Sequence, residues 1–399
     1  MTKDKGPLGG SLMRPFPAPG SASWPVVTPI YPSVVYASET PDALDAQYEG
    51  RVSGYTYSRE GHPNADVVAN LVGAMEGIEG GTLTGSGMGA VTAVLMGLFK
   101  SGDHVIGGNQ LYGRSLRMMK EDLPRLGFGV SLVDAGDADA VKAAIRPETR
   151  AVLIEVVANP TLRIADLDGI ARVCREAGVL LVVDNTFTTP RALRPFEHGA
   201  DIVIHSLTKL LAGHSDVMLG WVGARDAAIA QRLDVFAVTA GLTPSPFDCW
   251  LAERGMLTFP LRFEKAQANA RALAEAMVDL PGMARVIYPG RPDHPDANRA
   301  AALVGGQGGN MLSFELTGGR AAANAFTAAA RGLNFAPTLG DVGTTISHPA
   351  SSSHRALTPE ERGALGISEG FFRLSVGLEE TEALIEVITA AVDAANRAG

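Results

Sequence analysis

Three nearly continuous runs of Val, Ile and Leu constrain the fold of this chain more than any other feature. They are Ala151–Ile154, Val179–Val183 and Ile202–Ile204. Runs without polar alternation are typical of parallel strands whose two faces are both covered by crossover helices. Two shorter apolar runs and a helix pattern at Ala90–Leu98 come earlier in the chain. Strands and helices therefore alternate between about residues 65 and 225, which predicts an α/β fold with a mostly parallel sheet.

The pattern changes towards both ends of the 399-residue chain. Residues 1–32 hold seven of the 24 prolines, which cannot donate to a helix or a sheet, so we predict an extended arm over 1–60. Such an arm often lies across a second subunit, although a loose tail is an equal alternative for residues 1–20. A large domain is expected over 61–255 and a smaller α+β domain over 256–399, because Asn310–Leu316 alternates like a half-buried antiparallel strand.

Composition excludes several classes of protein. The net charge of −9 argues against a nucleic-acid partner, which requires a basic face. No apolar run approaches a membrane span, and no apolar signal segment follows the N-terminus, so we expect no membrane association and a cytoplasmic location. Two cysteines, Cys174 and Cys249, are too few for a disulfide framework, and the eight histidines lack metal-site spacing, so no metal is expected.

Polar side chains follow each of the three apolar runs. Glu155 and Asn159 follow the first, Asp184 follows the second, and Lys209 follows the third. The carboxyl ends of parallel strands are where ligands bind in such sheets. A lysine that can form a Schiff base, with a carboxylate that can keep a pyridinium nitrogen protonated, is what pyridoxal phosphate requires. Glu155 is expected to support these groups by hydrogen bonding rather than to react.

A glycine-rich segment, Thr84–Ala90, opens the predicted buried helix. Free N–H groups at a helix N-terminus bind phosphate, and the helix dipole adds to this attraction. Alone, this segment also fits a nucleotide-binding oxidoreductase. However, it does not have the form of a strand followed by G-x-G-x-x-G, and no P-loop lysine follows it. Together with Lys209 and Asp184, it predicts a cup for the phosphate of pyridoxal phosphate.

The segment Ser206–Lys209, followed by Gly213–Asp216, resembles the lysine signature of the Cys/Met-metabolism pyridoxal phosphate enzymes. This family includes cystathionine γ-synthases, cystathionine β- and γ-lyases, methionine γ-lyases and O-acylhomoserine sulfhydrylases. The resemblance runs from about Tyr55 to Glu380. It implies the fold-type I architecture of aspartate aminotransferase, with a seven-stranded, mostly parallel sheet in a large cofactor-binding domain and a smaller C-terminal α+β domain.

By this resemblance, Lys209 forms the Schiff base and Asp184 pairs with the pyridine nitrogen. Tyr112 stacks on the ring, and Asn159 lies near the ring and the substrate carboxylate. The resemblance assigns the cofactor's phosphate to Ser86, Gly87, Met88, Ser206 and Thr208 of the same subunit, and to Tyr57 and Arg59 of a neighbouring subunit. The active unit is therefore expected to be a homo-oligomer, a tetramer built as a dimer of dimers.

The resemblance also implies an amino-acid substrate. Arg373 matches the arginine that binds the α-carboxylate, and Thr338 stands in the segment that the family reads as Ser-Leu-Gly. A bidentate guanidinium suits a carboxylate. Burial and cationic neighbours can make Lys209 a usable base near neutral pH, and Tyr112 is a plausible proton donor.

The expected reaction is γ-elimination or γ-replacement on a sulfur-containing or O-acylhomoserine substrate. β-Elimination from cystathionine is the alternative within the family, and a non-catalytic paralogue is an alternative outside it. Arg114 departs from the family pattern after the stacking tyrosine, whereas Arg117 occupies a position that is arginine in several cystathionine-handling members. They either favour an anionic leaving group such as a succinyl ester or serve a subunit interface, and the sequence leaves both open.

Overall fold

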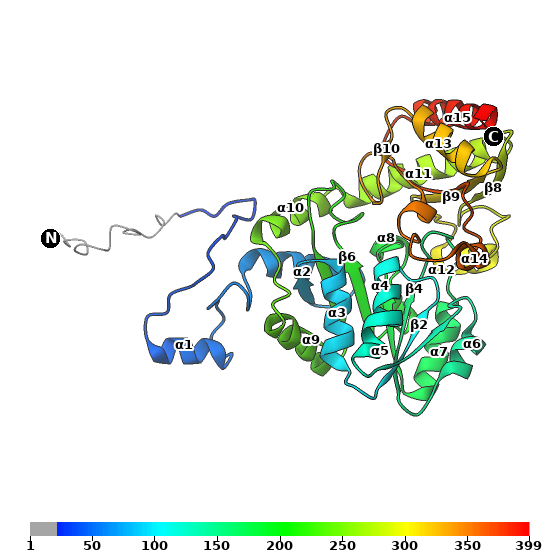
Figure 1. Ribbon diagram of the computed structural model, residues 1–399. Helices are drawn as coiled ribbons and strands as arrows, with labels where there is room; N and C mark the ends of the chain where they lie inside the picture. Colours follow the sequence, from blue (N-terminus) through cyan, green and yellow to red (C-terminus); the bar gives the residue numbers. More distant parts are fainter. Residues whose placement is uncertain (1–21, 399) are drawn as a thin grey trace.

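The computed structural model describes residues 22–398, which form two sheets with helices packed around them (Figure 1). The larger sheet has seven strands in the order β1-β7-β6-β5-β4-β2-β3. Only β7 runs against its neighbours; the other strands are parallel. The strands are β1 (Thr82–Thr84), β2 (His104–Gly108), β3 (Gly129–Val133), β4 (Thr149–Glu155), β5 (Leu180–Asp184), β6 (Ile202–Ser206) and β7 (Gly220–Ala224).

Helices cover both faces of this sheet, as the unbroken apolar runs require. One face packs on α3 (Gly87–Leu98), α4 (Gly113–Arg117) and α9 (Ala227–Thr239), and the opposite face packs on α2 (Pro63–Glu76), α7 (Leu167–Ala177) and α10 (Pro246–Met256). Successive strand residues alternate between the two cores: Val182 belongs to the α3 side, and Val183 belongs to the α2 side. The remaining helical segments of this part are η2 (Met118–Asp122, a π-helix), α5 (Leu123–Arg125), α6 (Ala138–Ala144), α8 (Thr189–Ala192) and η3 (Pro195–His198).

The smaller sheet has five strands in the order β10-β11-β12-β9-β8. All of its pairs are antiparallel except β10 with β11. The strands of this sheet and the helices of the same part of the chain are α11 (Phe259–Met277), β8 (Met283–Ile287), α12 (Ala297–Val304), β9 (Met311–Leu316), α13 (Gly319–Ala329), β10 (Asn334–Phe335), β11 (Thr345–Ser347), η4 (Pro349–Ser351), α14 (Pro359–Ala364), β12 (Phe371–Ser375) and α15 (Thr381–Ala398). Three phenylalanines, Phe314, Phe326 and Phe372, form the centre of its core, with ring centroids 5.0–5.3 Å apart.

These two sheets confirm the predicted α/β class, the mostly parallel seven-stranded sheet and the antiparallel character of the C-terminal part. β1 and β7 carry no clear strand signal in the sequence, because β1 has only three residues and β7 contains two glycines. The longest helix of the described chain, α11, begins at Phe259, one residue before Pro260, where proline suits the first turn.

Residues 22–60 extend away from the two sheets (Figure 1). This part of the predicted arm includes one helix, α1 (Pro41–Tyr48), whose first turn is capped by the Thr40 side chain. Residues 1–21 lie outside the described part of the chain, and the proposed boundaries after residues 60 and 255 stay predictions. Between residues 22 and 398, the structure contains no helix long and apolar enough to cross a membrane.

We expect Phe372→Ala to destabilise the protein by about 3–5 kcal/mol, because the lost ring leaves a cavity beside Phe314 and Phe326. Urea unfolding followed by circular dichroism measures this change. Phe335→Ala, at a phenylalanine that is 54% exposed, is the matched control and should change stability by less than about 1 kcal/mol. Equal effects of the two substitutions would contradict the assignment of this core.

Candidate active site

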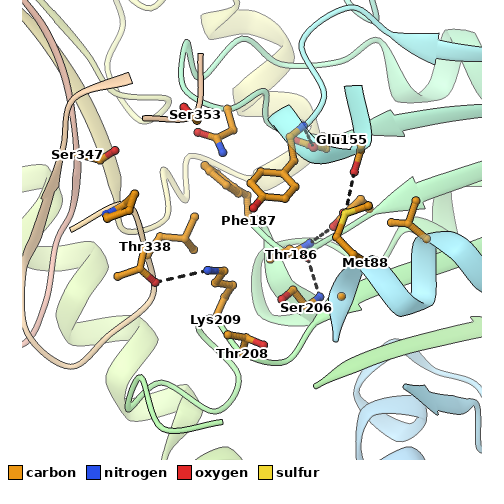
Figure 2. Close-up of a pocket in the computed structure, with 18 of the residues that line it drawn as sticks. Met88, Glu155, Thr186, Phe187, Ser206, Thr208, Lys209, Thr338, Ser347 and Ser353 are labelled. Atoms are coloured by element: carbon orange, nitrogen blue, oxygen red, sulfur yellow. Dashed lines mark hydrogen bonds between the residues drawn. The ribbon is translucent and has the colours of Figure 1, made fainter. Parts of the chain in front are cut away.

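A cavity of about 210 Å³ opens beside the carboxyl ends of β4, β5 and β6, between the two sheets (Figure 2). It also reaches the start of α3 and the strand β12 of the smaller sheet. The structure brings most of the predicted site residues together here. Those that line the cavity are Ser86, Gly87, Met88, Tyr112, Asn159, Asp184, Ser206, Thr208, Lys209, Thr338 and Arg373.

One end of the cavity is a cradle of backbone N–H groups and hydroxyls. Ser86 caps α3, since its side chain accepts a hydrogen bond from the backbone N–H of Gly89 at 3.0 Å. Gly87 lies so close to β6 that a Cβ atom there would be 2.7 Å from Cβ of Ser206. The first N–H groups of a helix have no partner within the helix, and they attract anions. This end of the cavity therefore suits a phosphate group.

Asp184 is the last residue of β5 and faces the cavity. Burial raises the pKa of its carboxyl group, while hydrogen bonds from Thr186 and the charge of His205 act in the opposite direction. The backbone N–H of Thr186 donates to Oδ1 of Asp184 at 3.0 Å. The carboxyl group of Asp184 therefore lies where a ligand in the cavity can reach it.

Lys209 follows β6 after a short turn, and its amine points into the cavity (Figure 2). Its Nζ atom donates to Oγ1 of Thr338 at 3.4 Å, which brings the small domain to the lysine. Burial lowers the pKa of this amine, and the nearby charge of Arg373 lowers it further. A lysine whose pKa is lowered has a larger neutral fraction near pH 7, and the neutral amine is the nucleophilic and basic form.

Arg373, on β12, is 4% exposed. Its Nη1 donates to Oδ1 of Asn159 at 2.6 Å, and its Nη2 donates to the carbonyl of Thr338 at 2.7 Å. Its Nε is buried without a hydrogen-bond partner. Burial lowers the pKa of the guanidinium to about 10, so it stays charged at neutral pH. A buried charge with an unused donor indicates a site for an anion.

Glu155 also lines the cavity, although its sequence position predicts only a supporting role through hydrogen bonds. One carboxylate oxygen, Oε1, accepts the backbone N–H of Tyr112, and the other is buried without a partner. Burial and the neighbouring charge of Asp184 raise its pKa well above the ordinary value. β4 and β5 pair Glu155 with Asp184, so one of these two adjacent carboxyl groups is favoured in its protonated form.

Other lining residues were not found by sequence reasoning. Thr186 and Phe187 lie two and three residues after Asp184, and this closeness in sequence was the available signal for them. Ser347, Ser352 and Ser353 come from the smaller domain and carry no motif. The loop that holds Ser353 approaches Gly113 so closely that a Cβ atom there would lie 2.5 Å from the Ser353 carbonyl oxygen.

Four predicted residues lie outside the cavity of this single chain. Tyr57 and Arg59 belong to the N-terminal segment, where the guanidinium carbon of Arg59 lies 5.4 Å from the centre of the Tyr57 ring. Arg114 and Arg117 are exposed on α4, and Arg117 forms an ion pair with Glu121 at 3.2 Å. The structure of one chain thus does not bring these four residues to Lys209.

The cavity fits pyridoxal phosphate in three respects. The cradle at Gly87 and Ser206 leaves room for a phosphate because no side chain stands at Gly87. The buried carboxyl of Asp184 is a partner for a protonated ring nitrogen, and the amine of Lys209 lines the same cavity. In a protein with a large α/β domain and a second, smaller domain, these groups define a pyridoxal phosphate-dependent enzyme.

Comparisons with known proteins agree with this class. The family model described as Cys/Met metabolism PLP-dependent enzyme matches residues 18–393. The chain is 38% identical to L-methionine gamma-lyase of Porphyromonas gingivalis over 90% of both chains, and 41% identical to cystathionine gamma-lyase of Bacillus subtilis over 86% of this chain and 90% of that one. The crystal structure of cystathionine gamma synthase from Xanthomonas oryzae pv. oryzae in complex with cystathionine superposes with a TM-score of 0.89, at 37% identity and 94% coverage of both chains.

The chain therefore belongs to the Cys/Met metabolism family of PLP-dependent enzymes, and its cofactor is pyridoxal phosphate. The predicted family, fold type and cofactor are confirmed. The roles of individual residues stay predictions.

We expect Gly87→Ala to weaken cofactor binding about tenfold or more, because the added methyl group would press on Ser206 at the phosphate cradle. Titration of the apoenzyme with pyridoxal phosphate, followed by visible absorbance, measures the affinity. Gly363→Ala is the matched control, since a Cβ atom there meets nothing within 4 Å. A Gly87→Ala variant that binds as tightly as the control would argue against a phosphate at this end of the cavity.

Proposed function

We propose that this enzyme catalyses γ-elimination or γ-replacement on an amino acid whose Cγ carries sulfur or an O-acyl group. The observation that carries the proposal is the arrangement of one cavity: a half-buried lysine with a lowered pKa, a carboxyl group at the end of β5, and a buried arginine with an unused donor. The similarity to a methionine gamma-lyase and a cystathionine gamma-lyase supports this choice of chemistry.

Five residues of the cradle are proposed to hold the cofactor's phosphate: Ser86, Gly87, Met88, Ser206 and Thr208. Asp184 would pair with the ring nitrogen, and Tyr112 would lie against the ring. When bound, pyridoxal phosphate supplies an aldehyde for the Lys209 amine and a ring that accepts electrons. The free N–H groups at the start of α3 and the buried position of Asp184 support these assignments.

Lys209 is proposed to move protons at the substrate's Cα and Cβ atoms. Its amine must be neutral to accept a proton, and both burial and the charge of Arg373 favour the neutral form. Thr338 accepts a hydrogen bond from this amine and so holds it inside the cavity. Tyr112 is the proposed proton donor to the leaving group, and Glu155 fixes its backbone N–H.

Arg373 and Asn159 are proposed to bind the substrate's α-carboxylate. The guanidinium is already oriented by the Asn159 side chain and the Thr338 carbonyl, and its Nε remains for a further acceptor. A carboxylate held by an oriented guanidinium has a defined position, which brings Cα to the lysine. Thr338 contacts both Lys209 and Arg373, so it links the base to the carboxylate site.

We also propose a homotetramer built as a dimer of dimers, in which Tyr57 and Arg59 serve a neighbour's phosphate. The N-terminal segment supports this proposal, since Trp24 is 86% exposed and Val27 is 62% exposed in a single chain. The exposed position of Arg114 and Arg117 supports a role at such an interface rather than in the cavity. A cytoplasmic location is proposed because both cysteines are free and buried, as is usual in reducing compartments.

A substrate panel tests the proposed reaction. The purified holoenzyme is incubated with methionine, cystathionine and O-acylhomoserines with a thiol, and 2-oxobutanoate and pyruvate are measured. We expect 2-oxobutanoate or a γ-replacement product from at least one substrate, and no product from the Lys209→Ala variant. Pyruvate as the only oxo acid would instead assign β-elimination, and no turnover with any of these substrates would overturn the proposal.

Arg373→Lys separates substrate binding from cofactor binding. Lysine keeps the charge but presents all its donors from one nitrogen atom, without the planar fork that bonds Asn159, Thr338 and a carboxylate in three directions. We therefore expect KM to rise about 10- to 100-fold, as for one lost charge-assisted hydrogen bond. The visible absorbance of the bound cofactor should be retained. Arg285→Lys, at a half-exposed arginine paired with Glu315, is the control. An unchanged KM in Arg373→Lys would remove this residue from the substrate site.

A further inference from the structure

A second buried polar cluster lies on the opposite face of the large sheet from the cavity. It consists of Glu76, Asn185 and His205, which are each at most 1% exposed. Oε1 of Glu76 accepts hydrogen bonds from Nε2 of His205 at 2.5 Å and from Nδ2 of Asn185 at 2.8 Å. Oε2 of Glu76 is buried and has no hydrogen-bond partner. The reaction proposed above uses none of these three side chains.

The alternation of strand residues places this cluster directly behind the active site. Val182 and Ile204 belong to the core on the α3 side, so Asp184 and Ser206, two residues further on, face the cavity. Asn185 and His205 point to the other side, where Glu76 ends α2. The backbone N–H of Asn185 donates to the carbonyl of Ile204 at 2.9 Å, which locks the two strand ends together.

A buried carboxylate is tolerated only when a cation or several donors compensate for its lost hydration. The carboxylate of Glu76 has one amide donor and one imidazole donor, and the imidazole is the only one of the two that can carry a charge. The hydrogen bond to Glu76 holds the His205 ring in place, and the charge of His205 acts on Asp184. That charge opposes the effect of burial on Asp184, because it lowers the pKa that burial raises.

We propose that Glu76 is a positioning residue that holds the His205 ring behind Asp184, where the charge of His205 favours the ionised form of Asp184 for the cofactor's ring nitrogen. The inference rests on the proposed role of Asp184. It adds a residue from a helix that does not reach the cavity, since no residue of α2 lines it.

The other charged groups around Asp184 lie on the cavity side. Glu155 comes from β4, Lys209 follows β6, and Arg373 comes from β12. Burial keeps the pKa of Glu155 raised, which favours its neutral form, and the charge of Arg373 lowers the pKa of Lys209. β7 contributes Trp221, an uncharged ring whose centroid is 5.8 Å from that of His205. Behind Asp184, therefore, His205 supplies the favourable charge among these packed elements.

The test compares the wild-type holoenzyme with Glu76→Gln, which keeps the shape and the acceptor oxygen but removes the charge. Visible absorbance of the bound cofactor is recorded as the pH is lowered, at a fixed concentration of free pyridoxal phosphate. Circular dichroism at each pH separates cofactor loss from unfolding. Without the Glu76 carboxylate, His205 no longer offers Asp184 the same favourable charge, and the pKa of Asp184 rises. We therefore expect the pH of half-loss of the cofactor to move upward by about one unit.

His205→Gln provides an independent measurement of the same shift, and remains informative if Glu76→Gln does not fold. The double variant should show no further shift, because both substitutions remove one interaction. Glu79→Gln removes an exposed carboxylate three residues away and should leave the half-loss pH unchanged. The proposal would be overturned if the shifts of the two single variants add in the double variant. It would also be overturned if the variants have a lower melting temperature but an unchanged half-loss pH, which would leave Glu76 a structural role.

The proposed function fails in a different way. It fails when the wild-type holoenzyme turns over none of the γ-substituted amino acids. The positioning role of Glu76 fails when the wild type binds cofactor normally and the half-loss pH of its variants does not move.

Discussion

The hydrogen bond from Arg373 to Asn159 joins the two sheets of this enzyme inside its active site. Arg373 belongs to β12 of the smaller sheet, and Asn159 follows β4 of the larger one. A guanidinium that is 4% exposed is costly to bury, so its partners must be well oriented. The same charge lowers the pKa of Lys209 and attracts the carboxyl of Glu155. One buried cation therefore sets both the geometry and the electrostatics of the cavity.

Much of this arrangement could be predicted from the sequence because its signals are local. Unbroken apolar runs gave β4, β5 and β6, and the residues just after them gave Asp184 and Lys209. The order of polar residues at strand ends is enough to place them at one sheet edge, since parallel strands end together. The glycine-rich start of α3 was weak evidence alone, and it gained meaning only beside the other two groups.

The parts that could not be predicted depend on contacts between distant segments. Ser353 enters the cavity because its loop packs on Gly113, some 240 residues earlier in the chain. Glu76 lies at an ordinary helix end, and nothing in its neighbours in sequence indicates a bond to His205. Tyr57 and Arg59 illustrate a different limit, because a family motif names their role while a single chain holds them away from Lys209.

The backbone around Lys209 is held by contacts from the smaller domain. On α11, the Arg262 guanidinium donates to the carbonyls of Leu210, Leu211 and Gly255 at 2.8–2.9 Å. Gly340, with φ of 83°, packs against the peptide that follows Lys209, where a Cβ atom would collide with Leu210. The lysine thus cannot shift without moving the smaller domain. Because Arg373 belongs to that same domain, the contacts that hold the base also fix its position relative to the carboxylate site.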